Sequence, residues 1–246
     1  MIEGVTFDWW NTLAVTTPEQ DGSLRGLRIS RLRPVLERLS PRAAISEERL
    51  FAAYDEQTKL LADTWARKLD VNAEEQITAF LRLAGLDGQG PSISDAVAEA
   101  FGGALLEIPP SLSPNVGATL ERLKEEGYAI GLVSNTGRTW GRYLRRLQDR
   151  LGIGKYFGVR VFSDEVGLRK PDPRIFEAAL SGLGLPRDRV VHVGDEVMAD
   201  IAGAKATGMR AVWFNTGFWR DAKTDRADAE IRDLAELPGI LRRWRA

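Results

Sequence analysis

The stretch Val5-Thr6-Phe7-Asp8-Trp9-Trp10-Asn11-Thr12-Leu13 decides the fold of this chain. Its short apolar run ends in a single carboxylate, Asp8, and a turn-prone Asn-Thr pair follows. This pattern is typical of a buried strand in a parallel sheet, with the carboxylate at the C-terminal edge. Catalytic groups of open α/β sheets collect at that edge, where an aspartate can be a nucleophile or a metal ligand. The structural alternative for Asp8 is a helix cap or a turn residue.

Three later stretches also place polar side chains just after a predicted strand or in a rigid turn. They are Leu132-Val133-Ser134-Asn135-Thr136-Gly137, Arg169-Lys170-Pro171-Asp172-Pro173, and the run from Val190 to Asp200 with its Gly194-Asp195 pair. Taken alone each stretch is a weak signal, and Lys170 by itself would be a surface lysine in a proline-rich turn. Because the carboxyl ends of parallel strands meet at one edge of a sheet, we expect these side chains to converge on Asp8.

The order of these side chains along the chain is far more specific than any one of them. In sequence they are Asp8, Ser134, Lys170, Asp195 and Asp200. This ordered set resembles the four motifs of the haloacid dehalogenase-like hydrolase superfamily, in its phosphatase-like branch with a helical cap. The resemblance covers residues 5 to about 217.

The resemblance implies a reaction through a covalent intermediate on the first motif. Asp8 would attack phosphorus and form an aspartyl-phosphate. Ser134 would donate a hydrogen bond to a phosphoryl oxygen, with the backbone N–H of Asn135 beside it. Lys170 would neutralise the developing charge and keep Asp8 ionised. The substrate would be a small phosphorylated metabolite.

The acidic side chains predicted at this edge also suggest Mg²⁺, which prefers oxygen ligands. Asp8 and Asp195 would each give one carboxylate oxygen. By resemblance to the family, the backbone carbonyl of Trp10 would complete the protein ligands. Asp200 would not contact the ion directly and would orient a water or Lys170.

Trp10 departs from the D-x-D-x-T pattern of the superfamily's phosphatases. In those enzymes the second aspartate protonates the leaving oxygen and then activates water. An indole only donates from Nε1 and cannot exchange a proton near neutral pH. We therefore expect phosphoryl capture by Asp8 to remain possible and hydrolysis of the intermediate to be slow, unless another group replaces the acid.

This departure leaves other functions open. A haloacid dehalogenase-like reaction fits less well, because it needs no Mg²⁺ and those enzymes lack the Gly-Asp motif kept at Asp195. A phosphonate-cleaving hydrolase would need a lysine in the cap to form an imine, for which the sequence offers Lys59 and Lys68. A catalytically impaired protein that binds metal or phosphate is the third alternative. The direction in which the Trp10 indole points would distinguish this third alternative from an active enzyme. An indole that fills the substrate space beside Asp8 would prevent catalysis.

The periodicity of the chain predicts an α/β fold with an inserted helical segment. Residues 16–108 contain only helical patterns, including one from Leu24 to Leu39, and are expected to form a cap domain. Residues 1–15 and 109–246 alternate strands with helices and are expected to form a Rossmann-like core. Numbered along the chain, its five strands are expected in the sheet order 5-4-1-2-3. The run from Ile231 to Trp244 is expected to be a closing helix.

A row of arginines surrounds the apolar stripe of the predicted helix from Leu24 to Leu39. Its members are Arg25, Arg28, Arg31 and Arg33. Close to an active site such a row could hold an anion, whereas on most helices it forms a solvated face.

Composition excludes several classes of function. The 246 residues carry a formal net charge of −1, so no overall field favours nucleic acid or an anionic membrane. Cysteine is absent, which excludes disulfides and thiolate metal sites. The one histidine, His192, lies between valines and is expected to be a core residue rather than a catalytic base. Without a signal-peptide pattern or a long apolar run, the protein is expected to be cytoplasmic; its oligomeric state cannot be read from the sequence.

Overall fold

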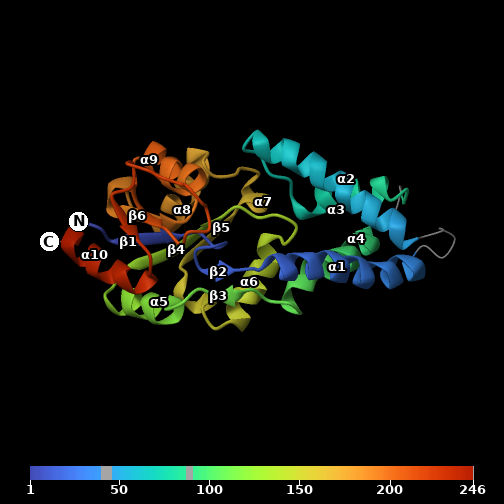
Figure 1. Ribbon diagram of the computed structural model, residues 1–246, viewed down its shortest axis with the longest axis horizontal. Coiled ribbons are helices and arrows are strands. Elements are labelled where there is room, and N and C mark those ends of the chain that lie inside the picture. The colour runs from blue at the N-terminus through green and yellow to red at the C-terminus, as the bar shows by residue number, and fades with distance from the viewer. Residues whose placement is uncertain (40–45, 87–90, 246) are drawn as a thin grey trace.

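The core of the protein is a six-stranded parallel sheet with the strand order β5-β4-β1-β6-β7-β8 (Figure 1). The computed structural model describes residues 1–39, 46–86 and 91–245. The strands are β1 (Gly4–Phe7), β4 (Ala129–Ser134), β5 (Val159–Phe162), β6 (Val190–Gly194), β7 (Arg210–Phe214) and β8 (Ala229–Ile231). The chain thus has the α/β class that the sequence predicted.

Strand β1 lies inside this sheet, between β4 and β6, and positions the residues that directly follow it. It pairs in parallel with β4 on one side and β6 on the other, with Phe7 opposite Leu132 and Val193. All four of its residues are buried, as expected for a strand covered on both faces. The first residues after β1, β4 and β6 therefore emerge side by side at one edge.

Helices cover both faces of the sheet. One face packs in a large apolar cluster with α5 (Val116–Glu125), α6 (Gly141–Arg150) and α10 (Leu237–Arg245). The other face packs with α8 (Pro173–Leu183) and α9 (Gly203–Thr207). Figure 1 shows these two layers around the strands. The short helix α7 (Ser163–Val166) directly follows β5.

A segment of helices separates β1 from β4. It consists of α1 (Pro18–Leu39), α2 (Glu47–Ala66), α3 (Ala73–Leu83) and α4 (Pro91–Gly102). These helices share an apolar cluster of their own, which Trp140 and Tyr143 join from the core. The chain enters and leaves this segment through an antiparallel two-stranded ribbon of β2 (Ala14–Val15) and β3 (Ser111–Leu112).

Two element boundaries differ from the sequence prediction. Helix α1 begins at Pro18, six residues before the predicted Leu24, because proline suits the first turn of a helix and a polar first turn carries no apolar stripe. Ile231, predicted as the first residue of a closing helix, is instead the last residue of strand β8, and α10 starts only at Leu237. Pairing with β7, which places Ile231 opposite Phe214, outweighs the weak local preference of three residues.

None of the helices in the described ranges combines the length and the apolar composition that crossing a membrane requires.

Candidate active site

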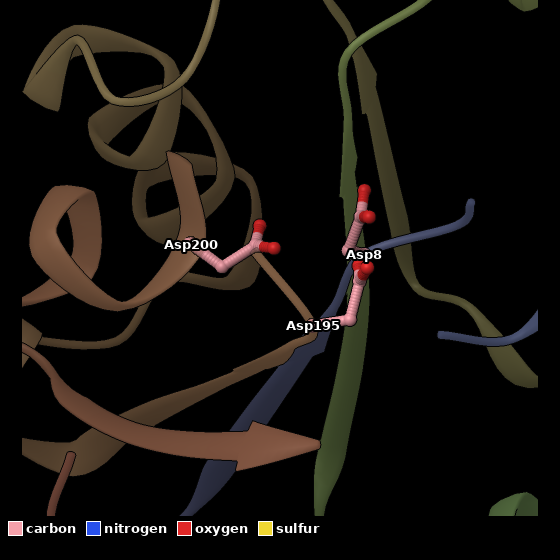
Figure 2. A group of neighbouring side chains, drawn as sticks. All are labelled: Asp8, Asp195 and Asp200. Atoms are coloured by element: carbon pink, nitrogen blue, oxygen red, sulfur yellow. The ribbon is translucent and has the colours of Figure 1, made fainter. Parts of the chain in front are cut away.

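Asp8 lies at the centre of the site, directly after β1. Its backbone N–H donates to the carbonyl of Val193 at 2.9 Å, which extends the pairing of β1 with β6 by one residue. The side chain is only 6% exposed, and Oδ1 accepts a hydrogen bond from Lys170 Nζ at 2.6 Å. Figure 2 shows its carboxylate beside that of Asp195, with Asp200 facing both.

Lys170 is held in place by Asn135, the first residue after β4. The Asn135 side chain accepts from the backbone N–H of Lys170 at 2.8 Å and donates to its carbonyl at 3.2 Å. The Lys170 ammonium is buried and donates to both Asp8 Oδ1 and Asp200 Oδ1, each at 2.6 Å. Asn135 thus fixes the main chain from which the lysine reaches the carboxylates.

Asp200 accepts three hydrogen bonds from donors of the protein, the first of them from Lys170. Oδ1 also accepts from His192 Nε2 at 3.0 Å, and Oδ2 accepts from the backbone N–H of Glu196 at 3.0 Å. On its other side, His192 Nδ1 lies 2.9 Å from the Thr6 hydroxyl. Because Asp200 sits on a π-helical turn that folds back against β6, a Cβ at Gly194 would collide with its carboxylate. Glycine is therefore required at position 194.

Asp195 follows β6 and has a different set of partners. Its Oδ1 accepts from the Thr12 hydroxyl at 3.2 Å, and its Oδ2 accepts from the Trp219 indole N–H at 2.7 Å. Its backbone carbonyl accepts from the Trp213 indole at 2.9 Å. Trp219 comes from the loop after β7 and is 43% exposed, so an exposed loop reaches directly onto a buried carboxylate.

Electrostatics in this cluster are dominated by burial and by the surplus of carboxylates. Burial raises the pKa of Asp8 well above its usual range, although Lys170 opposes the shift. Burial and then the charge of Asp200 raise the pKa of Asp195 to about 6. For Asp200 itself the charge of Lys170 and the hydrogen bond from His192 outweigh burial, so its pKa lies below its usual range. Burial lowers the pKa of His192, which keeps the ring neutral.

These residues fit a divalent cation. One carboxylate oxygen from each of Asp8, Asp195 and Asp200 can be chosen so that all lie within 4.8 Å of one another, and all three residues are buried. Three carboxylates face one lysine, so the ionised cluster holds a surplus of negative charge that a divalent cation would neutralise. All the available donor atoms are hard oxygens, which Mg²⁺ prefers.

A cavity of about 180 Å³ opens beside Asp8. Its walls include Lys170, Asp195, Glu196 and Trp10, so a cavity remains beside Asp8 with tryptophan at position 10. Trp10 is half-buried and packs edge-to-face on Trp9, with ring centroids 6.2 Å apart. The space in which a substrate would approach Asp8 is therefore retained.

The structure brings Asp8, Lys170, Asp195 and Asp200 together, as the spacing of the motifs predicted. Ser134 ends β4 at the same edge, but it is fully buried, donates to the Asn135 carbonyl at 3.4 Å, and is absent from the cavity walls.

Three contacts of the site were not predicted from the sequence, and they involve the side chains of Asn135, Thr12 and Trp219. For Asn135 the sequence predicted a role for the backbone N–H alone, and Thr12 was part of the quoted motif without a role. Trp219 lies 24 residues after its partner Asp195, on a loop with no motif, so no local signal could have found it.

Comparisons with known proteins identify the family. Residues 2–208 match the family described as "haloacid dehalogenase-like hydrolase". A glyceraldehyde 3-phosphate phosphatase from Pyrococcus furiosus is 35% identical over 130 residues, and this chain spans only 52% of that relative's length. A glyceraldehyde 3-phosphate phosphatase from Methanopyrus kandleri is 29% identical over 248 residues, which are 98% of each chain.

A solved structure agrees with the family over the whole fold. The 2-haloacid dehalogenase from Pseudomonas syringae pv. Tomato superimposes with a TM-score of 0.71 at 29% identity, covering 99% of this chain and 100% of that one. The relatives' names thus include both phosphatases and a dehalogenase. Since the family match covers most of the chain, this protein belongs to the haloacid dehalogenase-like hydrolases.

Proposed function

We propose that this protein is a Mg²⁺-dependent phosphatase that acts on a small phosphorylated metabolite. The observation that carries the proposal is the position of Asp8. Its buried carboxylate lies 2.6 Å from the Lys170 ammonium, close to the carboxylates of Asp195 and Asp200, and it lines a cavity. The phosphatase names of two relatives support the same reaction class.

In this proposal Asp8 is the nucleophile. One carboxylate oxygen forms a bond to phosphorus, the bond from phosphorus to the leaving oxygen breaks, and the leaving oxygen takes a proton from water. A second water then attacks phosphorus, which releases inorganic phosphate and restores the carboxylate. Lys170 compensates the negative charge on the transferred group, and Asp200 with His192 behind it holds the ammonium in position.

Mg²⁺ would be held by Asp8, Asp195 and the backbone carbonyl of Trp10, and when bound it would supply charge compensation for the phosphate. Ser134 and the Asn135 backbone N–H would bind phosphoryl oxygens, which requires the Ser134 hydroxyl to leave its present partner. Thr12 would orient the Asp195 carboxylate.

The helices of residues 16–108 would act as a cap over the core of residues 1–15 and 109–246. Support comes from a cavity of about 740 Å³ whose walls include Tyr54 and Trp65 from α2 and Thr136 and Arg138 from the loop after β4. The β2–β3 ribbon is the short connection about which such a cap would open. A cytoplasmic location remains a prediction from the sequence.

A haloacid dehalogenase is the second candidate. The Pseudomonas syringae structure favours it, whereas the cluster of three buried aspartates favours the phosphatase. The phosphonate-cleaving alternative loses support because Lys59 and Lys68 are both exposed and absent from the walls of the two cavities.

A paired assay separates the candidates. Inorganic phosphate is measured from glyceraldehyde 3-phosphate and para-nitrophenyl phosphate, and chloride from 2-chloropropionate, each with Mg²⁺ and with chelator. The proposal expects phosphate release only with Mg²⁺ and none from the Asp8→Asn variant. Chloride release that persists in chelator, without phosphate release, would replace the phosphatase by the dehalogenase.

A further inference from the structure

The larger cavity adjoins the cavity beside Asp8, because the two share part of their lining. Four residues line both spaces, and they are Trp10, Asn11, Asn135 and Arg169. A volume of about 740 Å³ is within the range of small-molecule sites. A substrate whose phosphate reaches Asp8 would therefore extend its remaining groups into this larger space.

Two buried arginines line that larger space. Arg28 from α1 is 7% exposed and Arg138 from the loop after β4 is 8% exposed. Within the described residues neither guanidinium has a carboxylate at ion-pair distance, whereas Arg169 on the same wall is paired with Asp70 at 2.7 Å. The acidic side chain of the larger cavity, Asp21, is exposed. The wall thus holds two desolvated positive charges without a buried counter-charge.

Neutral partners hold both arginines in place. Arg28 donates to the Phe101 carbonyl at 3.3 Å, the Tyr54 hydroxyl at 3.1 Å and the Thr139 hydroxyl at 2.8 Å. The other guanidinium, Arg138, lies 3.8 Å from the centre of the Tyr54 ring.

Three neutral acceptors also hold Arg138. It donates to Gln57 Oε1 at 2.5 Å, the Tyr54 carbonyl at 2.7 Å and the Thr58 hydroxyl at 2.6 Å. A guanidinium has five N–H donors. Arg28 and Arg138 each make three hydrogen bonds here, so each keeps N–H donors for a further acceptor.

A buried guanidinium without a counter-charge is costly unless something else neutralises it. Burial lowers the pKa of Arg138 to about 10, and the charge of Arg28 adds to that shift, in accord with two positive charges that share one pocket. Hydrogen bonds to neutral hydroxyls and carbonyls orient these groups but do not cancel their charge. An anion in the cavity would do both.

We propose that Arg28 and Arg138 bind a second anionic group of the substrate, a carboxylate or a second phosphate, while its scissile phosphate lies at Asp8. This inference rests on the proposed phosphatase function and narrows it to doubly anionic substrates. Glyceraldehyde 3-phosphate, which has one anionic group, is then expected to be a poorer substrate than an acid of the same length.

The first test compares matched pairs of substrates with the native protein. The pair 3-phosphoglycerate and glycerol 3-phosphate differs in a carboxylate, and the pair fructose 1,6-bisphosphate and fructose 6-phosphate differs in a phosphate. Because hydrogen bonds to charged groups are strong, kcat/KM should be about 10- to 100-fold higher for the doubly anionic member of at least one pair. The pair that shows the preference identifies the chemistry of the second group.

The second test uses variants of the two arginines. Arg28→Gln and Arg138→Gln should remove the preference through a higher KM and leave para-nitrophenyl phosphate hydrolysis within about threefold, which also shows that the variants fold. Arg28→Lys should recover part of the preference. Arg25→Gln is the matched control, since Arg25 lies on the same helix but is paired with Asp55 at 2.7 Å and is absent from the cavity walls.

Calorimetry with the Asp8→Asn variant separates failure of this inference from failure of the proposed reaction. Tighter binding of 3-phosphoglycerate or fructose 1,6-bisphosphate than of its partner, lost in Arg28→Gln, would support the anion site even if no phosphate ester were hydrolysed. Equal dissociation constants within both pairs, or a preference that survives both arginine variants, would overturn it.

Discussion

Trp10 lies two residues after Asp8 and is one of the residues that line the cavity in which Asp8 would meet a phosphate ester. An aspartate at this position in related phosphatases handles the proton of the leaving group. The side chain here cannot, yet it leaves the cavity open. The missing proton transfer is therefore the expected limit on turnover.

Restoring the acid should raise the rate. Trp10→Asp is expected to increase steady-state turnover of para-nitrophenyl phosphate by about 10²- to 10⁴-fold, the usual worth of general acid–base catalysis. Trp10→Asn is the matched control, because it opens the same space without a titratable group. An equal gain in both variants would mean that space, rather than proton transfer, limits the native protein.

The fluorescence of Trp219 should report the binding of Mg²⁺ at Asp195. Its indole donates to Asp195 Oδ2 at 2.7 Å, so Mg²⁺ binding by that carboxylate should change the environment of this ring. Titration with Mg²⁺ is expected to change tryptophan fluorescence, and Trp219→Phe should lose most of that change. Trp244→Phe, at the far end of the core in α10, should keep it. A signal that survives in Trp219→Phe would contradict the contact.

At the scale of elements, the junction of α6 and α7 depends on one buried acid. Asp164 in α7 accepts from the backbone N–H of Gly141, the first residue of α6, at 3.1 and 3.2 Å. Burial raises the pKa of Asp164 to about 6. The folded protein therefore holds this proton more tightly than the unfolded chain, and the resulting stabilisation is lost as the pH rises from about 4 past 6.

Asp164→Asn should remove this dependence, because an amide can still accept from Gly141 but does not ionise. Relative to the native chain, the variant's free energy of unfolding should be higher at pH 8 than at pH 4 by up to about 3 kcal/mol. Urea unfolding at the two pH values measures the difference. A variant whose offset from the native chain is the same at both values would show that Asp164 is ionised throughout.

Elements with strong periodicity were predictable from the sequence, and those defined by pairing were not. Strand β1 is a continuous apolar run, so its place in a parallel sheet followed from its residues. Strand β8 has only three residues, and its partner β7 decides its conformation. The π-helical turn that carries Asp200 likewise has no sequence signal, although the residue itself stood out by its spacing from Gly194-Asp195.

For the site, sequence spacing predicted which charged groups meet. Asp8, Lys170 and Asp195 all follow strand ends or occupy a turn at one edge, so the parallel topology brings them together. The contacts of Trp219 and the positions of Arg28 and Arg138 on the walls of the larger cavity depend on tertiary folding alone. The arginine row on α1 had two possible meanings, and the structure separates them residue by residue. Arg25, Arg31 and Arg33 have acidic partners, whereas Arg28 has none within the described residues and lines the larger cavity.

For the whole molecule, the surplus of buried carboxylates should make stability depend on Mg²⁺. A ligand that binds only the folded state stabilises it, by about 2.7 kcal/mol at a hundredfold excess over its dissociation constant. For a chain of this size the unfolding midpoint should rise by on the order of 5 to 10 °C. Differential scanning fluorimetry with Mg²⁺ and then with excess chelator measures the rise and its reversal.

Asp195→Asn should abolish this rise, while Asp55→Asn, an exposed residue of the helical segment, should keep it. A rise of the same size in both variants would place the cation elsewhere.

The most direct test of the account is a time course of nitrophenol release from para-nitrophenyl phosphate at near-stoichiometric enzyme with Mg²⁺. Asp8 as nucleophile and Trp10 in place of the acid together predict a burst of about one product per protein, followed by a slow phase. Chelator and Asp8→Asn should both remove the burst. Release that is unchanged in Asp8→Asn, or no release from protein that Mg²⁺ stabilises, would contradict the assignment of Asp8 as the phosphoryl acceptor.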